Sequence, residues 1–192
     1  MPDPRLVELL DSGTRRLVRS VDKMADDQWD QPSLLPGWTR AHVVAHLTLN
    51  AEGLSGALEG VHERRPVPMY ASDTARDTGI AQLARARPSE LRDRFLGSTT
   101  VIGERIEELA DNLADTVIDR TPGGRRFPAG DVGTMRVREV EIHHADLGLD
   151  YTAADWPDEF VVLLMDSRAG AEHDGAPFAA HAVDLERTWE FG

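Results

Sequence analysis

Apolar side chains recur at every third or fourth position through most of the first 150 residues, which is the spacing of one buried face of an α-helix. The earliest such stretch predicts a helix over residues 3–25, and the run Pro32-Ser33-Leu34-Leu35-Pro36-Gly37 then breaks the pattern. Thr39 has a side chain suited to capping a helix N-terminus, and it precedes a second predicted helix that continues to about Gly60.

The same periodicity predicts two more helical regions. One spans roughly residues 73–113 and is interrupted at Arg87-Pro88, because proline disfavours a helical conformation in the residue before it. A turn-forming segment, Arg120 to Gly133, then leads into a helix near residues 134–147. These four helices predict a mainly α protein built on an antiparallel four-helix bundle, with the crossover order left open.

The pattern changes after the fourth helix. Trp156-Pro157 opens a short predicted helix that continues to about Ala169, and two short strands are predicted at residues 178–183 and 188–191. Two strands alone do not form a stable sheet, so they belong to a second small α/β domain or pack on the bundle. We therefore expect a bundle domain over residues 1–150 and a C-terminal segment over residues 151–192.

Composition narrows the class of protein. No apolar run approaches the roughly 18–20 residues that a membrane span needs. The N-terminal residues lack the basic start and apolar stretch of a secretion signal, so we expect a cytoplasmic protein without a membrane partner. A formal charge of −13 opposes binding to nucleic acid, because phosphate contacts need clustered cations. Since the chain has no cysteine, any sulfur chemistry must use an external thiol.

The predicted fourth helix contains two polar residues where apolar ones are expected. At about 100° per residue, Glu139 and His143 fall in the middle of its apolar stripe. Burying a charged carboxylate without partners costs on the order of several kcal/mol, so the pair needs a compensating ligand. The Glu-x-x-x-His spacing also puts both side chains one turn apart on the same face, which suits the chelation of one ion.

The second helix contains a similar oddity. Its apolar centre is Val43, Leu47 and Leu54, and His46 borders that centre and is able to face the core. His42 lies further toward the polar side, and His144 is turned about 100° from His143, so we expect His144 at the periphery.

Each of these pairs taken alone is more often an ordinary surface or salt-bridged pair. Together, two histidines and one carboxylate from two helices form a three-ligand set that leaves zinc an open fourth position. Iron would also fit this set. Asp146, one turn after His143, is either a helix-end residue or a hydrogen-bond partner for a ligating histidine.

Several motifs along nearly the whole chain form a recognisable pattern: Trp29, Pro32-Ser33-Leu34-Leu35-Pro36-Gly37-Trp38-Thr39, His42-Val43-Val44-Ala45-His46-Leu47, Pro68-Met69-Tyr70-Ala71-Ser72, Arg136-Val137-Arg138-Glu139-Val140, His143, Asp146-Leu147 and Arg187-Thr188-Trp189-Glu190-Phe191-Gly192. In these motifs the sequence resembles the mycothiol-dependent maleylpyruvate isomerase family of the DinB-like superfamily. This resemblance implies a DinB-like bundle followed by a small C-terminal α/β domain, whose first strands the last residues resemble.

The resemblance also implies a site and a reaction. Its zinc ligands would be His46, Glu139 and His143, and Arg76 would face the active site and bind a substrate carboxylate. Arg76 is equally well explained as a solvated arginine at a helix start. The implied cosubstrate is mycothiol, and the implied reaction is cis–trans isomerisation of a maleylpyruvate-like acid.

Two alternatives stay open. A mycothiol S-transferase would use the same metal and thiol on other electrophiles, and a non-catalytic DinB-like module would bind metal without reacting. The expected partners are a small thiol and a small anionic substrate, and the residues do not predict an oligomeric state.

Overall fold

The computed structural model describes residues 3–169, 179–182 and 187–190. The chain divides into two compact units, Met1–Phe160 and Val161–Gly192. The first unit contains the helices α1 to α5, and the second contains most of α6 and a pair of strands. The division predicted at residue 150 stays a prediction.

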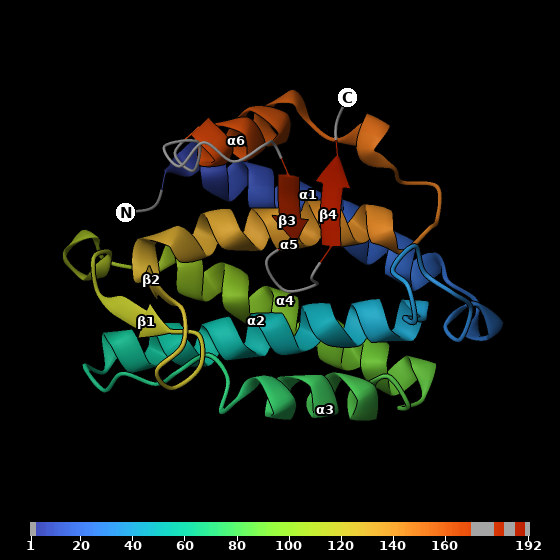
Figure 1. Cartoon of the computed structure of the whole chain (residues 1–192), viewed down its shortest axis with the longest axis horizontal. Coiled ribbons are helices and arrows are strands. Elements are labelled where there is room, and N and C mark those ends of the chain that lie inside the picture. The colour runs from blue at the N-terminus through green and yellow to red at the C-terminus, as the bar shows by residue number, and fades with distance from the viewer. Residues whose placement is uncertain (1–2, 170–178, 183–186, 191–192) are drawn as a thin grey trace. The chain divides into compact units, whose positions relative to one another are not determined.

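Four helices of the first unit form the bundle that the periodicity predicts, and α3 lies against it (Figure 1). Helix α2 packs mainly on α4, and α1 mainly on α5. Helix α5 also packs on α2, so it has a neighbour on two sides. The bounds are α1 Pro4–Lys23, α2 Arg40–His62, α3 Asp73–Leu83, α4 Pro88–Glu107 and α5 Val132–Asp146.

The helices begin where local chemistry favours a beginning. The Thr39 hydroxyl accepts a hydrogen bond from the backbone N–H of His42, as expected for an N-cap. The predicted break at Arg87-Pro88 is confirmed, because α3 ends at Leu83 and Pro88 occupies the first turn of α4. Single 3-10 turns join the helices at Asp26–Gln28, Asp111–Leu113, Ala129–Asp131 and Ala153–Asp155.

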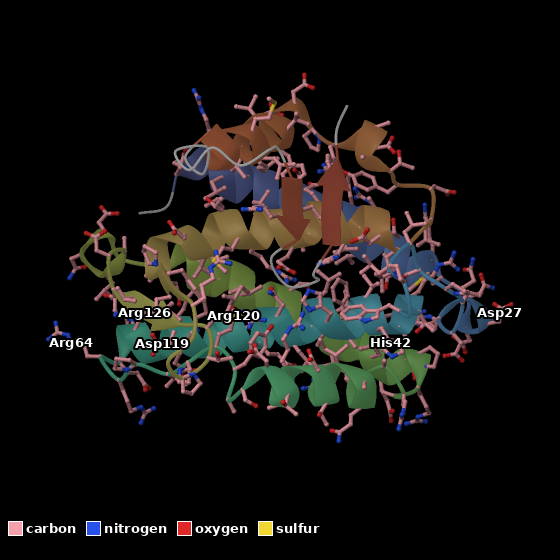
Figure 2. All side chains as sticks on the ribbon, viewed as in Figure 1. Asp27, His42, Arg64, Asp119, Arg120 and Arg126 are labelled. Atoms are coloured by element: carbon pink, nitrogen blue, oxygen red, sulfur yellow. The ribbon has the colours of Figure 1, made fainter. Side chains whose placement is uncertain are left out.

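A hairpin that the sequence did not predict lies between α4 and α5. Strand β1, Val117–Asp119, pairs antiparallel with β2, Arg126–Pro128. Asp119 and Arg126 face each other across the hairpin with an ion-pair distance of 3.3 Å (Figure 2). The segment predicted to be turn-forming contains the connecting turn, in which Gly123 has a φ of 72°.

The centre of the bundle is apolar and closely packed. Its fully buried side chains include Leu17 of α1, Leu47 and Leu54 of α2, and Phe95 of α4. Among the described residues, no helix combines the length and the apolarity needed to cross a membrane.

The described part of the second unit agrees with the predicted elements. Helix α6 spans Asp158–Ala169, and β3, Ala179–Ala182, pairs antiparallel with β4, Arg187–Glu190. Residues 178, 183 and 191, which were predicted to extend these strands, lie outside the described residues.

Candidate metal centre

Three side chains from α2 and α5 converge in the bundle, and we call them the ligand cluster: His46, Glu139 and His143. The Nε2 atom of His46 lies 2.9 Å from Glu139 Oε2, and His143 Nε2 lies 3.4 Å from the same oxygen. One ligand atom of each residue lies within 4.8 Å of those of the other two. Within the described part of the chain, this is the one group of three such residues that the geometry brings together.

The burial of the cluster is uneven. The His46 side chain has no exposed surface and that of His143 is 4% exposed, whereas 17% of the Glu139 side chain is exposed. The two imidazoles meet edge to face, with ring centroids 4.8 Å apart. The edge of the cluster at the carboxylate therefore remains accessible, while the imidazoles are held by the core.

The electrostatics favour an ionised carboxylate between two imidazoles. Burial by itself would raise the pKa of Glu139, but the adjacent His46 and His143 hold that pKa well below its ordinary value. Burial also lowers the pKa of His46, which favours the neutral ring that a metal ligand requires.

Asp146 orients His143 from behind. Its Oδ2 lies 2.9 Å from His143 Nδ1, and the carboxylate is itself buried. A carboxylate on one ring nitrogen fixes the orientation of the imidazole and directs the other nitrogen toward the cluster. The partner role considered for Asp146 from the sequence thus agrees with its position.

Two further side chains border His46. The Trp38 ring meets the His46 ring edge to face at 5.7 Å between centroids. Arg76 of α3 is 7% exposed, its NH2 lies 3.4 Å from His46 Nδ1, and its NH1 donates to Asp77 Oδ1 at 2.8 Å. Arg76 is therefore buried beside the cluster rather than solvated at the start of a helix.

The donor set fits a zinc-like ion. Tetrahedral zinc with bonds of about 2.0–2.2 Å to nitrogen and oxygen separates its ligand atoms by roughly 3.4 Å. The measured 2.9 and 3.4 Å lie close to that value, and the widest separation in the cluster is at most 4.8 Å. Small rotamer adjustments would thus be enough to place one cation between the three atoms.

A family model assigns this part of the chain. Residues 10–148 match the mycothiol maleylpyruvate isomerase N-terminal domain. The chain belongs to this family. The match contains all three residues of the ligand cluster together with Trp38, Arg76 and Asp146.

Solved structures agree with the assignment to the mycothiol maleylpyruvate isomerase family. The chain is similar to a crystal structure of the mycothiol-dependent maleylpyruvate isomerase and to one of a histidine-to-alanine variant of that enzyme, each at 30% identity and a TM-score of 0.78. Both comparisons cover 85% of this chain and 68% of the other. A search of curated proteins found no significant match.

The two histidines that were not predicted as ligands, His42 and His144, differ in their burial and their contacts. His42 (Figure 2) is half-buried, and its Nδ1 lies 2.8 Å from the Thr39 hydroxyl, so it belongs to the cap of α2. The prediction that His144 lies at the periphery was wrong, because only 2% of it is exposed. Helix α5 is covered by α1 on the side opposite α2, and His144 faces α1 with Nε2 2.8 Å from the Ser20 hydroxyl.

The sequence did not single out a second group built around a buried carboxylate, which we call the α1 cluster: Arg16, Glu141 and Tyr151. Arg16 donates to Glu141 Oε1 at 2.6 Å, and the Tyr151 hydroxyl donates to Glu141 Oε2. Helix α1 approaches α5 closely here because residue 13 is glycine. A Cβ at Gly13 would collide with the Glu141 carboxylate. The absence of a side chain at position 13 was the available signal.

Arg136 and Arg40 were also missed. Arg136 of α5 is 1% exposed and donates through NH1 to Leu47 O and to Asn50 Oδ1. Arg40 of α2 donates to Leu147 O and Gly148 O. Arg136 lies three residues before Glu139, on the same helical face, and that spacing was a usable signal.

Proposed function

We propose that His46, Glu139 and His143 hold one zinc ion and leave a coordination position open for a thiol. The observation that carries this proposal is the convergence of three donor atoms from two helices, around a carboxylate kept ionised inside the bundle. Two imidazoles and one carboxylate are a common catalytic zinc set. An ion that binds here displaces the proton on His143, whose pKa burial would lower but contacts with Asp146 and Glu139 raise to about 9. The partly exposed edge at Glu139 provides a route by which a cosubstrate reaches the open position.

We further propose that the chain catalyses the mycothiol-dependent cis–trans isomerisation of a maleylpyruvate-like acid. Zinc would lower the pKa of a bound thiol so that thiolate persists at neutral pH. The sulfur adds to one carbon of the cis double bond, and the electron pair moves into the conjugated carbonyl as an enolate. After rotation about the resulting single bond, the enolate expels the thiolate and re-forms the double bond in the trans geometry. The absence of cysteine agrees with the use of an external thiol.

Arg76 is the proposed partner of a substrate carboxylate and of the developing enolate charge. A His46 ring that binds a cation through Nε2 carries its proton on Nδ1, so it has no lone pair to offer the Arg76 N–H. Arg76 would then keep that N–H for the substrate. Its guanidinium is planar and fixed, which suits a bidentate contact with a carboxylate. Because this cation is local, the net charge of −13 does not prevent an anionic acid from binding.

The experiment is an isomerase assay of the zinc-loaded protein with mycothiol and a cis keto acid, in which both the acid and the thiol are followed. Trans acid with full recovery of the thiol supports the isomerase. A stable thioether product would point instead to a mycothiol S-transferase, and zinc binding without affinity for mycothiol would point to a non-catalytic module.

The role of Arg76 is tested by Arg76→Met in the same assay. Losing a charge-assisted contact of about 1.5–3 kcal/mol lowers kcat/KM by roughly 10- to 100-fold. Arg105→Met is the matched control, because Arg105 is a partly exposed arginine that pairs with Glu59 and Glu108 instead. Equal kcat/KM in the two variants would remove Arg76 from the site.

A further inference from the structure

Helices α2 and α5 run antiparallel, and an arginine joins them on each side of the ligand cluster. Arg40, at the start of α2, reaches the end of α5, where Nε donates to Leu147 O at 2.9 Å and NH2 donates to Gly148 O at 3.1 Å. Near the start of α5, Arg136 reaches back to α2, where NH1 donates to Leu47 O at 3.1 Å and to Asn50 Oδ1 at 2.9 Å.

The ligands lie between these two contacts. His46 comes six residues after Arg40 and four before Asn50, and Glu139 and His143 lie between Arg136 and Leu147 on the facing helix. Leu47, which accepts from Arg136, directly follows His46 in the chain. The arginine contacts therefore bracket the site within about one to two helical turns on each side.

The chemistry of Arg136 is unusual for a residue that only stabilises a fold. It is 1% exposed, and burial lowers its pKa to about 10, so it stays cationic at neutral pH. Burying a charge is costly, and replacing buried ionic groups with apolar residues of similar size is often neutral or stabilising. A cation at this position agrees with a requirement for geometry, because the NH1 group of Arg136 bonds two acceptors of α2 that lie one helical turn apart.

We propose that Arg136 and Arg40 are positioning residues that set the register of α2 against α5 and thereby preorganise the three ligands. The inference rests on the proposed zinc centre. A slip of one residue along a helix moves a side chain by about 1.5 Å and turns it by about 100°. Ligands need to be held within about 0.5 Å of their working positions, so even a partial slip removes an imidazole from the ion.

The test compares cobalt and zinc affinities of the full chain by chelator competition for wild type, Arg136→Met and Asn50→Leu. We expect both variants to bind the ions roughly 10- to 100-fold more weakly, as is typical when groups that orient ligands are lost. Their cobalt absorption spectra should also lose intensity in the tetrahedral region. Leu47 O and Asn50 Oδ1 lose their donor in Arg136→Met, so we expect the metal-free variant to melt below wild type, and ion affinity is compared at a temperature at which each variant is folded.

The matched control is Arg94→Met. Arg94 also joins another helix to α2, through two hydrogen bonds to Glu52 at 2.7 and 2.8 Å, but it lies on the exposed face. Its loss should leave both ion affinities unchanged. If Arg136→Met does not fold, Arg40→Lys provides the measurement, because lysine keeps the charge but not the fork, and about a 3- to 10-fold loss is expected.

Two outcomes would overturn the inference, and they differ in whether the proposed zinc centre survives. Wild-type affinity in a folded Arg136→Met protein, or in Arg40→Lys, would contradict the positioning role and leave the zinc centre intact. A wild-type protein that binds neither cobalt nor zinc would contradict the zinc centre itself, and the positioning role with it.

Discussion

Helix α5 contributes to a polar cluster on each of two opposite sides, and the two clusters differ in how their charges are compensated. In the α1 cluster, Glu141 accepts from Arg16 and Tyr151, while its own carbonyl accepts from the Trp156 indole at 3.2 Å. In the ligand cluster, one Glu139 oxygen is shared by two imidazoles that both approach it with Nε2. Both oxygens of Glu141 are occupied by donors from the chain, whereas the second cluster brings together three potential ligand atoms from three residues.

This difference indicates that the two clusters of α5 have different roles, one in stability and one in ion binding. Both oxygens of the buried Glu141 carboxylate accept a hydrogen bond, one from a guanidinium and one from a phenol, so this carboxylate needs no ligand to compensate it. Nitrogen and oxygen atoms of two histidines and one carboxylate that converge from two helices are what a metal-binding site provides. The comparison therefore predicts that the α1 cluster determines stability and that the ligand cluster determines ion binding, each with little effect on the other.

The largest expected effect on stability comes from breaking the α1 cluster. Glu141→Leu leaves the partly buried Arg16 without its partner, and we expect the free energy of unfolding to fall by about 3–4 kcal/mol, measured by urea denaturation of the metal-free protein. The double variant Arg16→Met with Glu141→Leu should recover much of this loss. Zinc affinity should stay at the wild-type value, and a loss of zinc from the folded variant would contradict the separation.

Removing the ion should affect stability only through the ligand cluster. At a free zinc concentration of about 100 times Kd, binding stabilises the folded state by about 2.7 kcal/mol. A strong chelator should then lower Tm by roughly 5–10 °C, as measured by calorimetry. The same chelator should not change the Tm of His46→Ala, and an equal shift in that variant would place the ion elsewhere.

A smaller effect is expected from the residue that orients His143. Asp146→Asn keeps the size of the side chain but removes the charge that holds the imidazole, so zinc affinity should fall about 10- to 100-fold. Chelator competition measures this change. An unchanged affinity would show that Asp146 only satisfies the end of α5.

The smallest expected effect on stability comes from removing one hydrogen bond of the α1 cluster. Tyr151→Phe removes one hydrogen bond to Glu141 and leaves Arg16 in place, so we expect a loss of about 1 kcal/mol and a Tm lower by about 2–4 °C. Thermal unfolding followed by circular dichroism measures it. A weaker affinity for zinc in this variant would show that the two clusters are coupled through α5.

The elements that the sequence predicted are those with strong local signals. Helices α1, α2, α4 and α5 were predicted because their apolar spacing and their caps agree, as at Thr39 and Pro88. The hairpin was missed because strands of three residues are too short to show alternation.

The site was predicted on one side of α5 only. Glu139 and His143 were predicted as ligands because they interrupt an apolar stripe, and their role stays a prediction. The position of His144 was predicted wrongly because periodicity assumes a single buried face, and α5 has two. Arg136 was missed because a long cationic side chain is normally exposed, and its spacing of three residues from Glu139 was not used as a sign that it shares the buried face.

The central claim is tested most directly by the zinc content of dialysed, folded protein, measured by mass spectrometry for wild type, His46→Ala and His42→Ala. His42 lies one turn before His46 on α2, contacts Thr39 and is outside the ligand cluster, so it controls for the loss of a histidine from that helix. We predict about one zinc per chain in wild type and His42→Ala and almost none in His46→Ala. Stoichiometric zinc in folded His46→Ala would contradict the proposed centre.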